Sequence, residues 1–246
     1  MENISLKQKN VLITGGTSGI GLATALELAQ RGANITIIGR HKAKLDEALS
    51  QIEKKSGQEA LGLVADVSDF NAVQMVFETL DSLVGTIDVL INNAGLPARS
   101  VLNTEVLKME YFIKTSLLGY LYCSKFAAER MLKRGSGGHI VNIGSLSSFT
   151  RDADSDLYVA AKSGIEGFNE SLRKLISPEC VRVSIIDPGS TGTGMIDETS
   201  EERQEAFSNY LLLEPEDVAR AVLFCLEQPV HCEILRVQLR PHRQII

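Results

Sequence analysis

A tyrosine followed four residues later by a lysine is the pattern in this 246-residue chain best suited to acid–base chemistry. Tyr158 and Lys162 lie on one face of a predicted helix, because positions i and i+4 are neighbours, and of the five tyrosines only Tyr158 has a lysine at this spacing. A nearby ammonium favours the phenolate of a tyrosine, and lowering its pKa from about 10 towards 7 takes about 4 kcal/mol. The phenol can then exchange a proton with a reacting oxygen, which Ser145 can hold from the other side. The alternative is an ordinary surface pair of helical side chains.

A glycine-rich loop follows the first predicted strand and is typical of a phosphate-binding site. Glycines allow a tight turn and a close approach of the backbone, and the next helix points its N-terminal amide groups at an anion. The spacing differs from the common dinucleotide fingerprint, which has one residue between its first two glycines, so a plain turn is the alternative. The residues expected to contact a pyrophosphate are Gly15, Thr17, Ser18, Gly19, Ile20 and Gly21.

The end of the second predicted strand indicates which dinucleotide this loop would bind. No Asp or Glu lies between Asn34 and Lys44, where NAD-binding sheets usually carry an acidic residue for the ribose 2′-hydroxyl. Arg40 follows the strand directly, and a guanidinium forks onto a 2′-phosphate through charge-assisted hydrogen bonds that contribute roughly 1.5–3 kcal/mol. We therefore expect NADP(H) to be preferred over NAD(H). The alternative is that Arg40 is a solvated charge at the start of the next helix.

Two further strand ends carry residues that suit the walls of a cofactor pocket. Asp66 precedes Val67 at the end of the third strand, and its carboxylate can accept from the amino group of an adenine or interact with the start of the next helix. The fourth strand ends in a segment of asparagines and small residues that would let the backbone pass beside a cofactor, although alone it is only a turn signal. Its candidate residues are Asn93, Ala94 and Gly95.

Short apolar runs alternate with longer helical ones along the whole chain. Strands are expected at Val11–Thr14, Ile35–Ile38, Leu61–Ala65, Ile87–Ile91, Ile140–Ile143, Val181–Ile186 and Glu233–Leu239, and helices at Ile20–Gln30, Lys42–Lys55, Ala72–Leu83, Val106–Leu132, Leu157–Ile176 and Pro215–Leu226. Apolar strands separated by helices indicate a parallel sheet covered on both faces, the doubly wound α/β architecture. We therefore expect a single Rossmann domain over residues 1–246, with ligands outside the carboxyl ends of its strands and a substrate lid at about 189–210.

Composition and charge exclude several classes of function. The 25 Lys and Arg against 31 Asp and Glu give a formal net charge of −6, so no nucleic-acid partner is expected. No apolar run reaches the length of about 18 residues that a membrane span needs. The four cysteines show no Cys-x-x-Cys spacing and indicate reduced thiols in a cytoplasmic protein. The four histidines are scattered, so no metal site is expected.

The chain resembles the short-chain dehydrogenase/reductase family over nearly its whole length. The motifs that carry the resemblance are the loop at 14–21, Asp66, the segment at 92–95, the set of Ser145, Tyr158 and Lys162, and the Pro188-Gly189 pair after the sixth strand. Each motif is modest alone, but their order and spacing together are specific. The resemblance implies a seven-stranded Rossmann sheet, a homodimer or homotetramer, and NAD(P)-dependent oxidoreduction of a carbonyl or an alcohol.

The resemblance also assigns roles to these residues. Tyr158 would be the general acid and base, Ser145 would position the substrate oxygen, and Lys162 would bind the nicotinamide ribose and lower the pKa of the tyrosine. The segment after the sixth strand would contact the nicotinamide, with Thr193 at the position that contacts the carboxamide and Thr191 where the family more often has an aliphatic residue. The cofactor contacts expected in this segment are Pro188, Gly189, Thr191 and Thr193.

Three positions depart from the family pattern. Ser116 stands where the family usually has an asparagine whose backbone carbonyl holds a water of the proton relay, so we expect slower proton exchange rather than lost chemistry. Ser18 stands where many NADP-dependent relatives have a basic residue, so Arg40 would provide the phosphate selectivity largely alone. The segment at 237–241 lacks the Val-Asp-Gly-Gly ending of many relatives, which weakens an assignment as an acyl-carrier-protein reductase.

These observations favour an NADPH-dependent reductase of small ketones or aldehydes that runs reversibly with secondary alcohols. The alternatives are a non-catalytic NADP(H)-binding sensor or partner-binding protein, a 3-oxoacyl-thioester reductase, and an epimerase or dehydratase on the same site. Substrate choice is expected to depend on Leu96–Thr104 and on the lid segment, and Arg99 and Arg151 are candidates to meet an anionic substrate.

Overall fold

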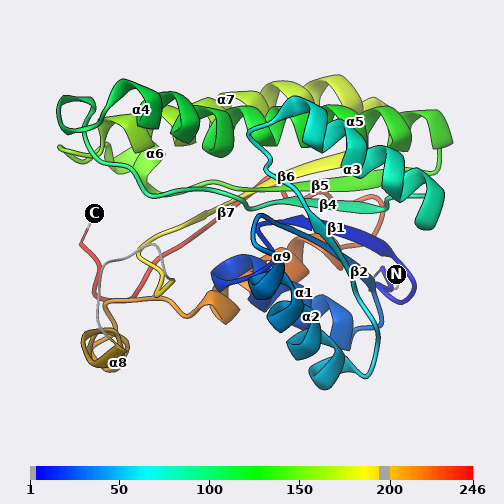
Figure 1. The fold of residues 1–246 in the computed structure, drawn as a ribbon, viewed down its shortest axis with the longest axis horizontal. Helices are drawn as coiled ribbons and strands as arrows, with labels where there is room; N and C mark the ends of the chain where they lie inside the picture. Colours follow the sequence, from blue (N-terminus) through cyan, green and yellow to red (C-terminus); the bar gives the residue numbers. More distant parts are fainter. Residues whose placement is uncertain (1–3, 194–199, 246) are drawn as a thin grey trace.

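The described residues, 4–193 and 200–245 of a computed structural model, form a parallel sheet between two layers of helices (Figure 1). The strand order is β3-β2-β1-β4-β5-β6-β7, so the chain adds strands towards one edge from β1 to β3 and towards the other edge from β4 to β7. This change opens a crevice at the carboxyl ends of β1 and β4. The predicted doubly wound α/β fold is therefore confirmed. The seven strands are β1 (Asn10–Thr14), β2 (Asn34–Gly39), β3 (Leu61–Val64), β4 (Val89–Asn92), β5 (Gly138–Ile143), β6 (Val181–Pro188) and β7 (Arg236–Leu239).

Successive side chains of a strand point to opposite faces of the sheet, so strands that are apolar throughout supply apolar side chains to both faces. In β1, Val11 and Ile13 pack into one core and Leu12 packs into the other. The first core is covered by α1 (Gly19–Gln30), α2 (Lys42–Ser56) and α9 (Pro215–Leu226), which lie on one side of the sheet in Figure 1. On the other side lie α3 (Phe70–Leu83), α4 (Val106–Ile113), α5 (Gly119–Arg134) and α7 (Asp156–Ile176).

The helix predicted over 106–132 is interrupted, because α4 and α5 are joined by a π-helical turn, η2 (Lys114–Leu118). A π-helical turn contains one residue more than a turn of α-helix. The helices on both sides of it still carry apolar residues, so the sequence periodicity does not reveal the turn. The other short elements are η1 (Val101–Asn103), α6 (Ser147–Thr150), η3 (Ser177–Glu179) and α8 (Ser200–Ser208).

The last strand begins at Arg236, three residues later than predicted, because side chains take the place of main-chain pairing at residues 233 and 234. The Glu233 carboxylate accepts from the Val183 N–H at 2.8 Å, and the Ser184 hydroxyl donates to the Ile234 carbonyl at 2.5 Å. Part of the predicted lid forms α8, while its residues 194–199 lie outside the described ranges. Within those ranges no helix combines the length and the apolarity needed to cross a membrane.

Candidate cofactor and active site

The glycine-rich loop is fastened to the end of β4 by a single asparagine and a single threonine. The Asn93 side-chain amide donates to the carbonyls of Thr14 at 2.9 Å and Gly15 at 3.1 Å, while the Thr14 hydroxyl accepts from the N–H groups of Asn93 and Ala94. A Cβ atom on Gly21 would lie 2.4 Å from the Gly15 carbonyl oxygen, so that position excludes any side chain. These contacts close the loop tightly and turn the start of α1 towards the crevice.

A cavity of about 730 Å³ runs along the carboxyl ends of the strands. Most of the residues expected to bind a cofactor or to react line it, although they come from segments far apart in the sequence. Gly21, Asp66 and Ser116 are the expected residues that do not line the cavity. The expected residues that do are Gly15, Thr17, Ser18, Gly19, Ile20, Arg40, Val67, Asn93, Ala94, Gly95, Ser145, Tyr158, Lys162, Pro188, Gly189, Thr191 and Thr193.

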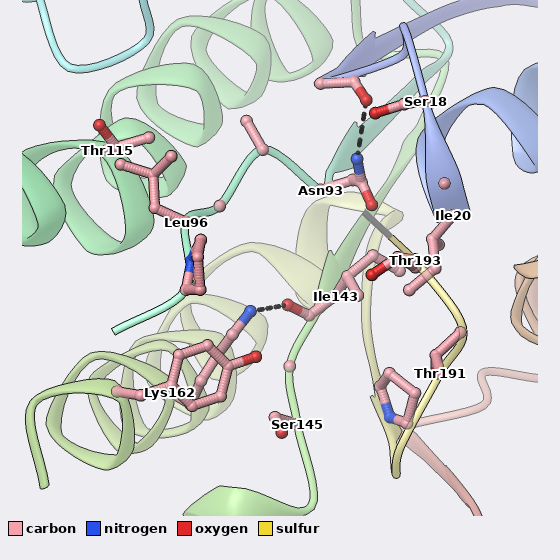
Figure 2. Close-up of a pocket in the computed structure, with 18 of the residues that line it drawn as sticks. Ser18, Ile20, Asn93, Leu96, Thr115, Ile143, Ser145, Lys162, Thr191 and Thr193 are labelled. Carbon is pink, nitrogen blue, oxygen red and sulfur yellow. Dashed lines mark hydrogen bonds between the residues drawn. The ribbon is translucent and has the colours of Figure 1, made fainter. Parts of the chain in front are cut away.

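Lys162 is buried and is held in place by the main chain of β5. Its ammonium donates to the Ile143 carbonyl at 2.8 Å, as Figure 2 shows, and it lies 5.7 Å from the centroid of the Tyr158 ring. The Tyr120 hydroxyl donates to the same carbonyl at 3.0 Å. Burial lowers the pKa of Lys162 to about 8, although the charge of Asp187 opposes this shift. Lys162 is therefore a cation that titrates close to neutral pH.

The phenol of Tyr158 stays protonated in the protein alone. Burial raises its pKa, and a hydrogen bond with Ser145 opposes the rise without reversing it. In the protein alone the desolvation of the phenolate therefore dominates the pKa of Tyr158, and the lowering of this pKa by Lys162 in the loaded site stays a prediction. A protonated phenol is the form required to donate a proton to a substrate oxygen.

Ser116 lies in the π-helical turn and does not line the cavity. Its side chain is fully buried, and its hydroxyl accepts from the Leu96 N–H at 3.1 Å. The neighbouring Thr115 lines the cavity instead. Ser116 thus anchors the segment after β4, and its role in a proton relay stays a prediction.

Asp66 is engaged by protein groups on both of its oxygens. Oδ1 accepts from the Ser68 N–H at 2.9 Å, and Oδ2 accepts from the Tyr111 hydroxyl at 2.6 Å. Burial raises the pKa of Asp66, but these hydrogen bonds outweigh burial and leave the pKa below its ordinary value. The contact at the entrance to α3 is thus present in the structure, and a contact of Asp66 with an adenine stays a prediction that can hold at the same time.

Tyr111 also connects Asp66 to Arg40, a link that sequence reasoning missed. The exposed Arg40 guanidinium donates to the Tyr111 hydroxyl and lies 5.9 Å from the centroid of its ring. Tyr111 stands on α4, 71 residues from Arg40, and no sequence motif marks it. Only the packing of α4 beside the ends of β2 and β3 brings the three side chains together.

The opposite end of the cavity includes a residue from the end of the chain. Gln244 lines the cavity beside Gly189, and its side-chain oxygen accepts from the Ser190 N–H at 3.1 Å. A Cβ atom on Gly19 would lie 3.2 Å from the Thr193 methyl group, so this segment reaches across to the glycine loop, as Figure 2 shows. Arg99 and Arg151, the expected contacts for an anionic substrate, are exposed and do not line the cavity.

Comparison with known proteins relates this chain to oxidoreductases. A family model described as short chain dehydrogenase matches residues 9–204. Carbonyl reductase family member 4 of Danio rerio is 37% identical over 223 residues, which cover 89% of this chain and 91% of that protein.

Two solved structures share the fold over nearly their whole length. A metagenomic short-chain oxidoreductase in complex with NADP has a TM-score of 0.84 at 27% identity, with 98% of this chain and 100% of that chain covered. A variant of actinorhodin polyketide ketoreductase with NADPH has a TM-score of 0.86 at 25% identity, with 95% and 96% covered.

Proposed function

The chain belongs to the short-chain dehydrogenase/reductase family and is an oxidoreductase, and on this basis we propose that it transfers a hydride reversibly between NADP(H) and a small ketone, aldehyde or secondary alcohol. The observation that carries the proposal is the grouping of Ser145, Tyr158 and Lys162 on the cavity that the glycine loop also lines. A binding module for NADP(H) would not need all three of these side chains.

The cavity fits a dinucleotide in shape and in the kind of groups that line it. Its glycines fill positions where a side chain would collide, because a Cβ atom on Gly15 would lie 2.9 Å from the Ala94 Cα atom. The first turn of α1 offers amide groups for a pyrophosphate, and Val67 offers an apolar surface for an adenine. Gly189, Thr191 and Thr193 would hold the nicotinamide beside Tyr158.

The protein's own residues supply the proton and the orientation of the substrate. Tyr158 donates its phenolic proton to the carbonyl oxygen, and the Ser145 hydroxyl holds that oxygen by a hydrogen bond. Lys162, fixed by the Ile143 carbonyl, binds the nicotinamide ribose and stabilises the phenolate that remains. NADPH, when bound, supplies the hydride. In the direction of alcohol oxidation the same phenolate takes the proton back.

Arg40 supports a preference for the phosphorylated cofactor. It lines the outer end of the cavity together with His41 and Lys44, and an acidic residue is missing from this part of the lining. The two solved structures described above hold NADP and NADPH. The relative named carbonyl reductase supports the reduction of a carbonyl group.

Turnover of a substrate panel tests the function directly. Ketones, aldehydes, secondary alcohols and an acyl thioester are each followed by NADPH absorbance, and NADPH binding is measured by fluorescence. We expect Tyr158→Phe to lose turnover by about 10²–10⁴-fold while NADPH binding is retained. Tyr122→Phe removes a hydroxyl outside the cavity and serves as the matched control. Tight NADPH binding with no consumption over the whole panel would instead favour a sensor.

The cellular compartment and the oligomeric state are further parts of the proposal. The described cysteines are all free thiols, which supports a reducing compartment such as the cytoplasm. We expect a homodimer or homotetramer, as in the family, and light scattering of the purified protein tests this expectation. A monomer at micromolar concentration would contradict it.

A further inference from the structure

Asp187 carries a buried carboxylate directly behind the active-site serine. Two main-chain hydrogen bonds continue the pairing of β5 and β6 past the end of β5, from the Gly144 N–H to the Ile186 carbonyl and from the Leu146 N–H to the Pro188 carbonyl. Between them, the Ser145 N–H donates to Oδ1 of Asp187 at 3.1 Å. A side-chain carboxylate therefore fixes the main chain of Ser145.

Gly144, the residue before Ser145, leaves the space that this carboxylate occupies. A Cβ atom on Gly144 would lie 2.0 Å from Oδ1 of Asp187, so any other residue there would push the carboxylate away. The side chain of Asp187 is only 1% exposed. Burying a carboxylate is costly unless charges and hydrogen bonds compensate, so its presence at this point calls for a compensating group.

Arg236 is that group, and it connects Asp187 to the helix of the reactive residues. Its Nε lies 3.2 Å from Oδ2 of Asp187, and its guanidinium donates to Glu166 at 2.7 Å. It also stacks over the Phe149 ring of α6, 4.8 Å from the centroid. Glu166 stands one turn beyond Lys162 on α7. The carboxylate thus joins β6 and β7 to the helix that carries Tyr158 and Lys162.

We propose that Asp187 is a positioning residue for hydride transfer, whose carboxylate, paired with Arg236, fixes the main chain of Ser145. Its negative charge also acts on the buried Lys162 and favours the ammonium form of that side chain. The inference rests on the proposed function only in assigning Ser145 and Lys162 to the reaction. The ion pair with Arg236 favours the charged carboxylate, because a protonated Asp187 would lose its charge attraction to the guanidinium.

The charge of Asp187 is lost in mildly acidic solution. Burial raises its pKa to about 6, with Arg236, the Ser145 N–H and Lys162 lowering it and Glu166 raising it. The charged groups that face it are Arg236 from β7 and Glu166 and Lys162 from α7, while the β5–α6 connection presents only the Ser145 N–H. Because the pKa is raised, the carboxylate is charged above about pH 6 and takes up a proton as the pH falls through that value.

The test separates the charge of Asp187 from its hydrogen bond. Asp187→Asn keeps an oxygen that accepts from the Ser145 N–H but removes the charge, and Asp187→Ala removes both. Carbonyl reduction and NADPH binding are measured from about pH 5 to 9. Wild type is expected to lose kcat as the pH falls through about 6, and to bind NADPH more weakly as the pH rises through about 8, where Lys162 loses its charge.

In Asp187→Asn we expect the acid loss to disappear and kcat at neutral pH to fall about tenfold. The weakening of NADPH binding should move to lower pH by at least about half a unit, because Lys162 has lost its neighbouring negative charge. Asp187→Ala should lower kcat by about a further tenfold, since the buried Ser145 N–H then has no acceptor. A purely structural role for Asp187 would lower the melting temperature without moving either pH curve.

Controls keep the outcome decisive. Glu170→Gln removes an exposed carboxylate of α7 that pairs with Lys174, and it should leave both curves unchanged. Arg236→Gln leaves Asp187 in place without its counter-ion, so the acid loss should move to higher pH, and this variant remains informative if both Asp187 variants fail to fold.

Wild-type kcat and wild-type pH curves in Asp187→Asn would overturn the proposal, as would an unmoved acid loss in Arg236→Gln. If wild type binds NADPH but reduces no substrate, the proposed function fails. The NADPH-binding curves of Asp187→Asn then still decide whether the charge of Asp187 acts on Lys162.

Discussion

The two ends of the cavity are held in place by different parts of the protein. At the catalytic end, Lys162 is bound to the carbonyl of Ile143, and Ser145 is held by the Asp187 carboxylate between two main-chain hydrogen bonds to β6. These groups are buried. At the outer end, Arg40 is exposed and is held by the side chain of Tyr111. The ends of the strands therefore orient Lys162 and Ser145, whereas a single side chain on α4 orients Arg40, on which the proposed cofactor preference depends. Changes at the first end should affect rate and folding, and changes at the second should affect affinity alone.

Lys162→Met should produce the largest effect and test whether the catalytic end depends on a buried charge. We expect turnover to fall by about 10²–10⁴-fold, because the phenolate of Tyr158 loses its cation. The free energy of unfolding should not decrease, since methionine fills a similar volume and no longer buries a charge. The Ile143 carbonyl also keeps its hydrogen bond from Tyr120. Steady-state kinetics and urea unfolding measure the two quantities, and turnover within tenfold of wild type would contradict the proposed role.

Gly144→Ala should test whether the catalytic end depends on close packing. Its added methyl group would lie 2.0 Å from the Asp187 carboxylate, so the Ser145 main chain must shift. We expect the free energy of unfolding to fall by about 1–3 kcal/mol and kcat to fall about tenfold or more. Gly167→Ala is the matched control, because nothing lies within 4 Å of the added methyl group on α7. Its substitution should stabilise the helix by about 0.5–1 kcal/mol. Equal behaviour of the two variants in urea unfolding would refute the packing argument.

The comparison of the two ends also explains what the sequence could predict. The central strands follow from apolar runs that are buried on both faces, whereas the edge strands β3 and β7 are only partly buried. The positions of Tyr158 and Lys162 follow from helical spacing. Asp187, Tyr111 and Gln244 could not be predicted, because each acts through a contact 42, 45 or 54 residues away in the chain. No local pattern encodes such a contact. The π-helical turn that contains Ser116 could not be predicted from the sequence either. It rotates the following helix relative to the preceding one, but it requires no particular residue type.

Arg40→Ala should affect the outer end without affecting folding. We expect NADPH to bind about ten- to a hundredfold more weakly, because a charge-assisted fork to the 2′-phosphate is lost. NADH binding and the free energy of unfolding should stay unchanged, since Arg40 is exposed. Lys42→Ala is the control, as Lys42 pairs with Asp46 and does not line the cavity. Fluorescence titration with both cofactors checks this. NADH binding as tight as NADPH binding in wild type would remove the basis of the selectivity argument.

Tyr111→Phe should have the smallest effect and shows how far the outer end relies on side-chain contacts. The substitution keeps the ring beside Arg40 but removes the hydroxyl that holds both the guanidinium and Asp66. The Arg40 side chain is then less restricted before NADPH binds, and ordering it on binding costs more free energy. We therefore expect NADPH affinity to fall by about two- to tenfold while kcat stays unchanged. The pKa of Asp66 should rise, because its strongest hydrogen bond is lost. If Arg40→Ala and the double variant bind NADPH equally, Tyr111 acts only through Arg40. A further loss in the double variant would mean that Tyr111 contacts the cofactor itself.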